Sequence, residues 1–192
     1  MASGWRAVQK ASRRAELLRA AAGLFAERGF AAVSTVELGD AVGMSGPALY
    51  NYVRSKDELL QELLQGASEQ LVAGAREILA EKLTPLETLV ALIGFHIDFA
   101  TSEPDIIRIQ DRELAQLPVE VNRRVRALQR EYVQNWDGVL ARHRSDLSGP
   151  ERQVRLLGTF GLLNSTPYSA PATHRDAGRI LGDMALRSLI EG

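Results

Sequence analysis

Cysteine is absent from this chain of 192 residues, which excludes disulfides, thiolate metal sites and cysteine chemistry. No apolar run approaches the ~18 residues needed to span a bilayer, and the first residues lack the apolar stretch of a signal peptide. The sequence also lacks the alternating apolar and polar pattern of β-strands, and it contains no internal repeat and no low-complexity segment. We therefore expect an all-α, cytoplasmic protein that has no membrane partner.

The sequence also lacks the patterns of a catalytic site. It has no His-x-x-x-His pair, no nucleophile elbow and no glycine-rich phosphate loop. Its three histidines, His96, His143 and His174, are far apart in the chain. A small helical enzyme would need a cluster of acids, bases or metal ligands, so we expect no enzyme, no cofactor and no metal site.

Positive and negative charges nearly balance overall, but they are unevenly distributed along the chain. The net charge is −1, yet residues 1–56 contain eight Lys and Arg against four Asp and Glu, and therefore carry +4, which leaves −5 for the remainder. A positive end on an acidic body is typical of a protein with one nucleic-acid-binding part.

One stretch, TVELGDAVGMSGPALYNYVRSKDEL, organises the chain. Thr35 is a suitable cap for a short helix, and Gly43 suits the left-handed conformation that ends it. Ser45 is placed to cap a second helix over residues 46–53, and Ser55 a third. Two short helices around a glycine turn predict a helix-turn-helix, whose second helix enters the DNA major groove.

This stretch and the preceding AELLRAAAGLFAERGFAAVST resemble the DNA-binding signature of the tetracycline-repressor (TetR) family of bacterial transcription regulators. The residues that carry the resemblance are Phe25, Gly29, Phe30, Thr35, Leu38, Gly43, Ser45, Leu49, Tyr50, Lys56 and Leu59. The family usually has alanine where Gly39 and Val42 stand, histidine at Tyr52 and phenylalanine at Val53. The resemblance implies a three-helix DNA-binding head, residues 1–55, on a six-helix body, residues 56–192, that binds a ligand and dimerises.

Apolar spacing and caps predict the remaining helices. We expect them over residues 12–28, 56–82, 84–102, 104–117, 119–143, 148–165 and 173–190, with Thr173 as the last cap and a loop over 166–172. Residues 1–12 are expected to form an arm that is either disordered or follows the DNA backbone or minor groove.

The second short helix holds the candidate DNA readers. Asn51 could read adenine, and Tyr50 and Tyr52 could reach phosphates; the resemblance assigns phosphate contacts to Tyr50 and Lys56. The alternative is that Tyr50 and Leu49 belong to the core of a small helical domain. The full set of candidates is Lys10, Arg13, Arg14, Thr35, Ser45, Gly46, Pro47, Ala48, Tyr50, Asn51, Tyr52 and Lys56.

The body offers a candidate ligand site, because the resemblance implies a small-molecule effector among residues 84–143. The candidate residues are Phe95, His96, Phe99, Ile107, Arg108, Gln110, Tyr132 and Trp136. His96 is either an ordinary core histidine or a ligand contact, and Arg108 would pair with an anionic ligand. Arg112 and Glu113 are expected to form ordinary ion pairs. An apolar or acyl-type effector, possibly an acyl-CoA, suits this lining, and the stretch resembles actinobacterial regulators of lipid and acyl-CoA catabolism.

The last two helices either complete the core or form a dimer interface, which the resemblance favours. The candidate interface residues are Val154, Leu157, Gly158, Gly161, Ile180, Leu181 and Met184. The resulting prediction is a homodimeric repressor on a near-palindromic operator in double-stranded DNA, released when an effector moves the helix that begins at Lys56. The alternative is a helix-turn-helix dimer without an effector.

Overall fold

The computed structural model describes residues 2–169 and 176–191, and within these ranges all regular structure is helical. The elements are α1 (Ala2–Arg28), α2 (Thr35–Ala41), α3 (Gly46–Leu49), α4 (Lys56–Ala80), α5 (Pro85–Ser102), α6 (Pro104–Glu113), the 3-10 turn η1 (Leu114–Gln116), α7 (Val119–His143), α8 (Gly149–Asn164), α9 (Thr166–Ser169) and α10 (Ala177–Ile190). The prediction of an all-α fold is confirmed. In the same ranges, no helix is both long enough and apolar enough to cross a bilayer.

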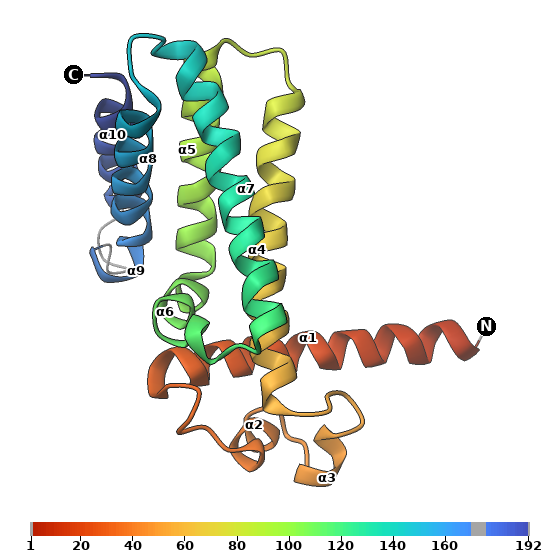
Figure 1. The fold of residues 1–192 in the computed structure, drawn as a ribbon. Coiled ribbons are helices and arrows are strands. Elements are labelled where there is room, and N and C mark those ends of the chain that lie inside the picture. The colour runs from red at the N-terminus through yellow and green to blue at the C-terminus, as the bar shows by residue number, and fades with distance from the viewer. Residues whose placement is uncertain (1, 170–175, 192) are drawn as a thin grey trace.

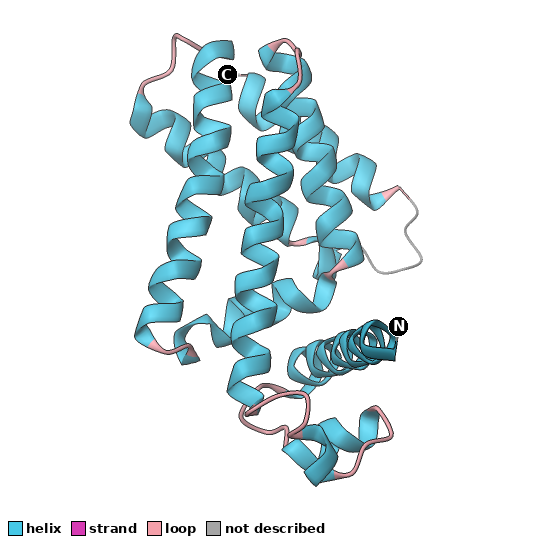
Figure 2. Ribbon diagram, turned by 90° about the vertical axis from the view of Figure 1, so that its right-hand side faces the viewer, coloured by secondary structure: helices cyan, strands magenta, loops and turns pink. Residues whose placement is uncertain are grey.

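The long helices α4, α5 and α7 stand upright beside one another, and α8 and α10 pack together next to α5 (Figure 1). Helix α1 crosses the foot of this bundle, and α2 and α3 lie below it (Figures 1 and 2). The molecule is thus a small helical head under a tall helical body, and α4 runs from one into the other.

Capping residues fix where several helices begin. Ser34, and not Thr35 as predicted, caps α2, because only Ser34 has a glutamate three residues later. The Ser34 side chain accepts a hydrogen bond from the Glu37 amide, and the Glu37 carboxylate accepts one from the Ser34 amide. The same reciprocal pair starts α5 and α8, at Thr84–Glu87 and Ser148–Glu151.

Residues 2–12 are part of helix α1, so of the two alternatives for this segment the disordered arm is wrong, and the contact with DNA stays a prediction. No proline interrupts this segment, so nothing stops the helix from extending toward the N-terminus. Trp5 and Val8 are exposed, and this part of α1 projects beyond α4 (Figure 1).

Two other segments also differ from the predictions. Helix α3 ends at Leu49 instead of residue 53, and the next residues form hydrogen-bonded turns, such as that from the Tyr52 amide to the Leu49 carbonyl, 2.9 Å. Part of the predicted loop, Thr166–Ser169, is the single-turn helix α9. The rest of that loop and the predicted cap Thr173 lie outside the described residues, and Asp176 precedes α10.

Buried side chains form two cores. The first joins α1, α2 and α3 to the lower half of α4, to α6 and to the start of α7, with Leu17, Phe25 and Ile109 fully buried in it. The second lies higher, among α4, α5, α7, α8 and α10, around the fully buried Trp136. The first core therefore extends from the head into the body.

Candidate functional site

The turn between α2 and α3 is tight. Gly43 has a φ of +65°, a conformation that suits glycine, and the Met44 amide donates to the Gly39 carbonyl, 2.8 Å. A Cβ at Gly39 would lie 2.7 Å from the Met44 carbonyl oxygen. Glycine at this position therefore allows the close approach that sets α3 against α2.

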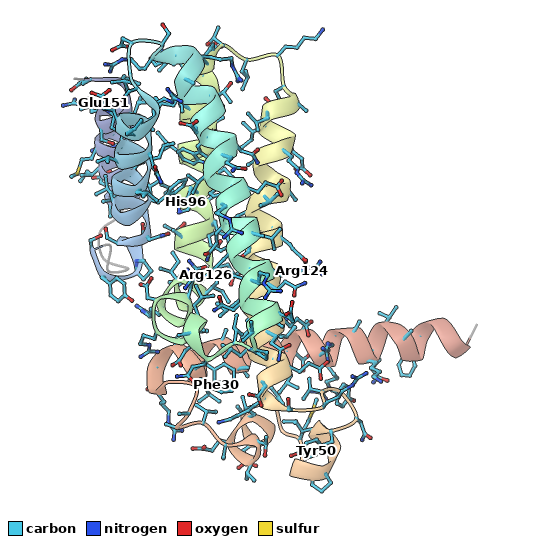
Figure 3. All side chains as sticks on the ribbon, viewed as in Figure 1. Phe30, Tyr50, His96, Arg124, Arg126 and Glu151 are labelled. Carbon is cyan, nitrogen blue, oxygen red and sulfur yellow. The ribbon has the colours of Figure 1, made fainter. Side chains whose placement is uncertain are left out.

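The surface of α3 and its following turn is open to solvent. Tyr50 is 56% exposed at the far end of the head from the body (Figure 3), whereas Leu49 is fully buried. Of the two, only Leu49 is a core residue. Ser45 precedes α3 as predicted, but its side chain forms no capping hydrogen bond within the described part of the chain. Other candidate readers are exposed (Pro47, Asn51) or half-buried (Thr35, Ala48, Tyr52), and Gly46 is the first residue of α3.

Lys56, expected at a phosphate, is engaged inside the head. Its ammonium donates to the carbonyl oxygens of Phe30 and Val33, both at 3.0 Å, and lies 4.5 Å from the centre of the Phe30 ring. The segment between α1 and α2 is thereby held to the first turn of α4. The two hydrogen bonds and the contact with the Phe30 ring would be lost if the ammonium turned to DNA.

Arg14 is engaged in a similar way. Its guanidinium donates to the Tyr52 carbonyl and forms ion pairs with Glu58, 3.0 Å, and Glu62. It therefore joins α1 to the turn after α3 and to α4. Lys10 and Arg13 lie on the outer, exposed part of α1, and Arg13 pairs with Glu16 at 2.9 Å.

A cavity of about 320 Å³ lies in the body between α4, α5, α6, α7 and α8. Five of the predicted ligand residues line it: His96, Phe99, Ile107, Gln110 and Tyr132. Sequence reasoning missed the contributions of α4 and α8, which are Ser68, Leu71, Leu157, Phe160 and Asn164. Those helices carry the same apolar spacing as any packed helix, so the sequence held no signal for them.

Three predicted ligand residues lie elsewhere. Phe95 packs its ring against Gly74 of α4, and the fully buried Trp136 packs edge-on against Phe160, 4.9 Å between ring centres. Arg108 pairs with Asp105 at 3.1 Å and donates to the Pro167 carbonyl at 3.0 Å. None of the three is part of the cavity lining.

His96 and its two partners, Tyr132 and Asn164, form a hydrogen-bonded polar group in the cavity wall. His96 is 3% exposed, with Nδ1 3.2 Å from the Tyr132 hydroxyl and Nε2 3.0 Å from Oδ1 of Asn164. Burial lowers the pKa of His96 to about 4, so the ring is neutral near pH 7. With the amide oxygen of Asn164 as acceptor, Nε2 carries the proton and Nδ1 accepts from Tyr132. These groups can orient a polar atom of a bound molecule.

Arg112 and Glu113 of α6 do not pair as predicted but hold the end of α1. The Arg112 guanidinium donates to the carbonyls of Phe25, 2.8 Å, and Ala26, where a cation is favourable at a helix C-terminus. Glu113, only 8% exposed, accepts from the Phe30 amide at 3.0 Å. Helix α6 therefore contacts the cavity on one side and the head on the other.

The outer face of α8 and α10 carries an apolar stripe. Val154 and Leu157 are exposed on α8, and Ile180 and Met184 on α10. Gly158 and Gly161 open the same face of α8, since a Cβ at either would meet nothing within 4 Å. Leu181, by contrast, is buried inside the subunit.

Comparisons with known proteins agree with this arrangement. The family model "Bacterial regulatory proteins, tetR family" matches residues 17–63, and "Tetracyclin repressor-like, C-terminal domain" matches residues 82–168. The HTH-type transcriptional repressor KstR2 of Rhodococcus jostii (strain RHA1) is 31% identical over 185 residues, which cover 94% of this chain and 89% of that protein.

Two solved structures share the fold. A TetR-family transcriptional regulator from Bordetella parapertussis 12822 has a TM-score of 0.86 at 22% identity, over 93% of this chain and 94% of that one. AibR in complex with isovaleryl coenzyme A and operator DNA has a TM-score of 0.78 at 20% identity, over 93% and 98%.

Proposed function

This chain belongs to the tetR family of bacterial regulatory proteins, and from that premise we propose that it is a repressor released from its operator by a small apolar or acyl-type effector. It is a transcription regulator and not an enzyme. Repression is proposed because the Rhodococcus relative is named a repressor and aligns with nearly the whole chain. The protein would act in the cytoplasm, where bacterial DNA lies.

The proposed DNA-binding surface is the open side of the head. Its readers would be Ser45, Gly46, Pro47, Ala48, Tyr50, Asn51 and Tyr52, with Thr35, Lys10 and Arg13 toward the phosphates. The exposure of Tyr50 and Asn51 supports this role, since both side chains are available to a groove. For Arg14 and Lys56 we propose an indirect role, because their donors hold the head in shape.

We also propose a two-fold dimer formed through the apolar stripe on α8 and α10. Exposed Leu157, Ile180 and Met184 support it, since a face of this kind is stable when a second copy covers it. Two heads related by a two-fold axis would match a near-palindromic operator. Residues 1–55 would then serve DNA binding, and residues 56–192 effector binding and dimerisation.

The observation that carries the effector proposal is the cavity between α4 and α8, with its polar group around His96. Its volume of about 320 Å³ lies within the range of small-molecule pockets, ~300–1,000 Å³. Phe99 and Ile107 give it apolar walls suited to an acyl chain. The complex of AibR with isovaleryl coenzyme A supports an acyl thioester as the ligand class.

Helix α6 supplies a route from this cavity to the head. Gln110 and Asp111 line the cavity, and the next two residues, Arg112 and Glu113, hold the end of α1. An effector that shifts α6 would move α1 and the base of α4 together, and so change the spacing between the two recognition helices. For release, the effector must bind the DNA-incompetent arrangement more tightly.

The test is a fluorescence anisotropy titration with a labelled duplex from upstream of the protein's own gene, at two salt concentrations and against a scrambled duplex. We expect sequence-selective binding that Tyr50→Ala and Asn51→Ala abolish and that octanoyl-CoA reverses. Weak binding to both duplexes that disappears with salt would contradict an operator at that position. Two results together would favour the effector-free alternative: the protein binds the operator selectively, and acyl ligands neither reverse this binding nor raise the melting temperature.

A further inference from the structure

A second hollow lies on the surface of the body, outside the cavity already described. It has a volume of about 470 Å³ and lies between α7 and the beginning of α8. Along α7 its lining runs from Arg126 to Asp137, which corresponds to about 16 Å of helix. This outer groove is therefore elongated along the length of α7.

The outer groove adjoins the inner cavity. Gln129, Val133 and Leu157 line both spaces, Leu157 from α8 and the other two from α7. Leu157 also belongs to the apolar stripe that we propose as the dimer face, so the junction between the two spaces lies at the edge of that face. A long ligand can therefore occupy both spaces at once, with Leu157 and Val133 around its middle.

The charges in the outer groove are unbalanced. Arg126 and Arg130 lie one helical turn apart, where like charges repel each other. In the ranges that the structure describes, Arg130 has no ion-pair partner, and Arg126 donates only to the amide oxygen of Asn122, 3.0 Å. The carboxylate in the wall, Asp137, already pairs with Arg152 at 2.8 Å. Two uncompensated guanidinium groups thus face an open groove.

Figure 3 places Arg126 on the part of α7 below His96, with Arg124 further toward α4, where it pairs with Glu69 at 3.0 Å. The arginines of α7 therefore lie on two sides of the helix. Arg124 forms an ion pair on the side of α4, whereas Arg126 and Arg130 line the outer groove. This difference makes the two groups suitable for a matched comparison.

We propose that the outer groove binds the phosphate-bearing end of an acyl-coenzyme A, whose acyl chain enters the inner cavity. Arg126 and Arg130 hold the phosphates, since a guanidinium binds phosphate through two parallel hydrogen bonds. The pantetheine arm passes Leu157 and Val133, so that the thioester lies toward His96 and Tyr132 and the acyl chain lies within the inner cavity. This inference rests on the proposed function, because it needs an effector in the inner cavity.

The test compares three full-length proteins by isothermal titration calorimetry: the native chain, the double variant Arg126→Gln/Arg130→Gln, and the matched control Arg123→Gln/Arg124→Gln. The ligands are butanoyl-, octanoyl- and dodecanoyl-coenzyme A, free octanoate, coenzyme A and an octanoyl lysophosphatidate. We expect octanoyl-CoA to bind the native chain more tightly than octanoate. The first double variant should weaken that binding about tenfold or more, as expected for losing a charge-assisted hydrogen bond, while its octanoate affinity stays unchanged. The control should bind all ligands as the native chain does.

Three outcomes would overturn the inference. The first is an octanoyl-CoA affinity that the two double variants lower equally or not at all. The second is lysophosphatidate binding as tight as that of octanoyl-CoA, which would assign the groove to a lipid headgroup. The third is that no acyl-coenzyme A binds the native chain. If octanoate still binds and releases the operator, the inner cavity remains the effector site and only the outer groove is refuted; a chain that binds no ligand at all refutes both.

Discussion

Replacement of Lys56 by methionine separates a structural role for this lysine from a DNA contact. Methionine keeps most of the apolar stem but removes the ammonium that donates to the Phe30 and Val33 carbonyls at 3.0 Å. A hydrogen bond to a charged group contributes about 1.5–3 kcal/mol. The ammonium is only half-buried, so water recovers part of each loss. We expect Lys56→Met to lower the free energy of unfolding by about 2–3 kcal/mol in total.

The measurement is thermal unfolding, together with the salt dependence of DNA affinity. For a chain of this size a loss of 2–3 kcal/mol lowers the melting temperature by about 4–12 °C. The slope of log affinity against log salt should stay unchanged, because no phosphate contact is removed. A lysine at a phosphate would behave in the opposite way, with an unchanged melting temperature and a slope smaller by about one.

Lys10→Met is the control, since Lys10 is exposed on the free part of α1. It should leave the melting temperature unchanged, and if Lys10 reaches a phosphate the salt slope falls by about one. A native melting temperature for Lys56→Met, with a reduced slope, would refute the structural role that the contacts of Lys56 support.

Three further predictions concern the body. In urea unfolding, Gly74→Ala should lower the free energy of unfolding by about 1–3 kcal/mol, because its Cβ would lie 2.2 Å from the Phe95 ring. The control is Gly66→Ala on the same helix, whose Cβ meets nothing within 4 Å, so it should be neutral or stabilising by up to about 1 kcal/mol. The folded pKa of His96, about 4, lies below its unfolded value of about 6.5, so the stability that this residue contributes is present above pH 6.5 and is lost as the pH falls toward 4. Unfolding curves from pH 7 to 4.5 should show a loss of stability that is smaller in His96→Gln than in the native chain. Glu113→Ala leaves the Phe30 amide after α1 without its acceptor, so it should lower the free energy of unfolding by about 1–3 kcal/mol in the same urea assay. It should also weaken the release of DNA by the effector about fivefold in anisotropy titrations, and a response equal to that of the native chain would contradict coupling through α6.

Much of the fold follows from local sequence rules. Thr84 with Glu87 and Ser148 with Glu151 start their helices where the capping pattern predicts, and Gly43 adopts the left-handed conformation expected of a turn glycine. These features depend on residues a few positions apart, so they can be predicted from the sequence. The true cap of α2, Ser34, follows the same rule, and its Glu37 partner could have identified it.

The candidate sites were less predictable, because they depend on contacts between distant residues. Lys56 and Arg14 carry the charge expected of phosphate contacts, but the carbonyls and carboxylates that engage them come from segments 23 to 48 positions away. Arg108 was expected at an anion, yet its partners are Asp105 and the Pro167 carbonyl. Charge and helical position are visible in a sequence, whereas the partner that occupies a charge is decided by tertiary packing.

The first core limits how the parts of this protein can be exchanged. Leu17 and Phe25 of the head share it with Ile109 of α6 and Val125 of α7, which lie far beyond residue 55. A fragment cut at that residue would expose these apolar side chains, so it should not fold alone. A chimaera that gives this head to another regulator must therefore include α6 and the start of α7. The operator specificity of the protein therefore cannot be transferred with residues 1–55 alone, because that surface needs the rest of the subunit in order to fold.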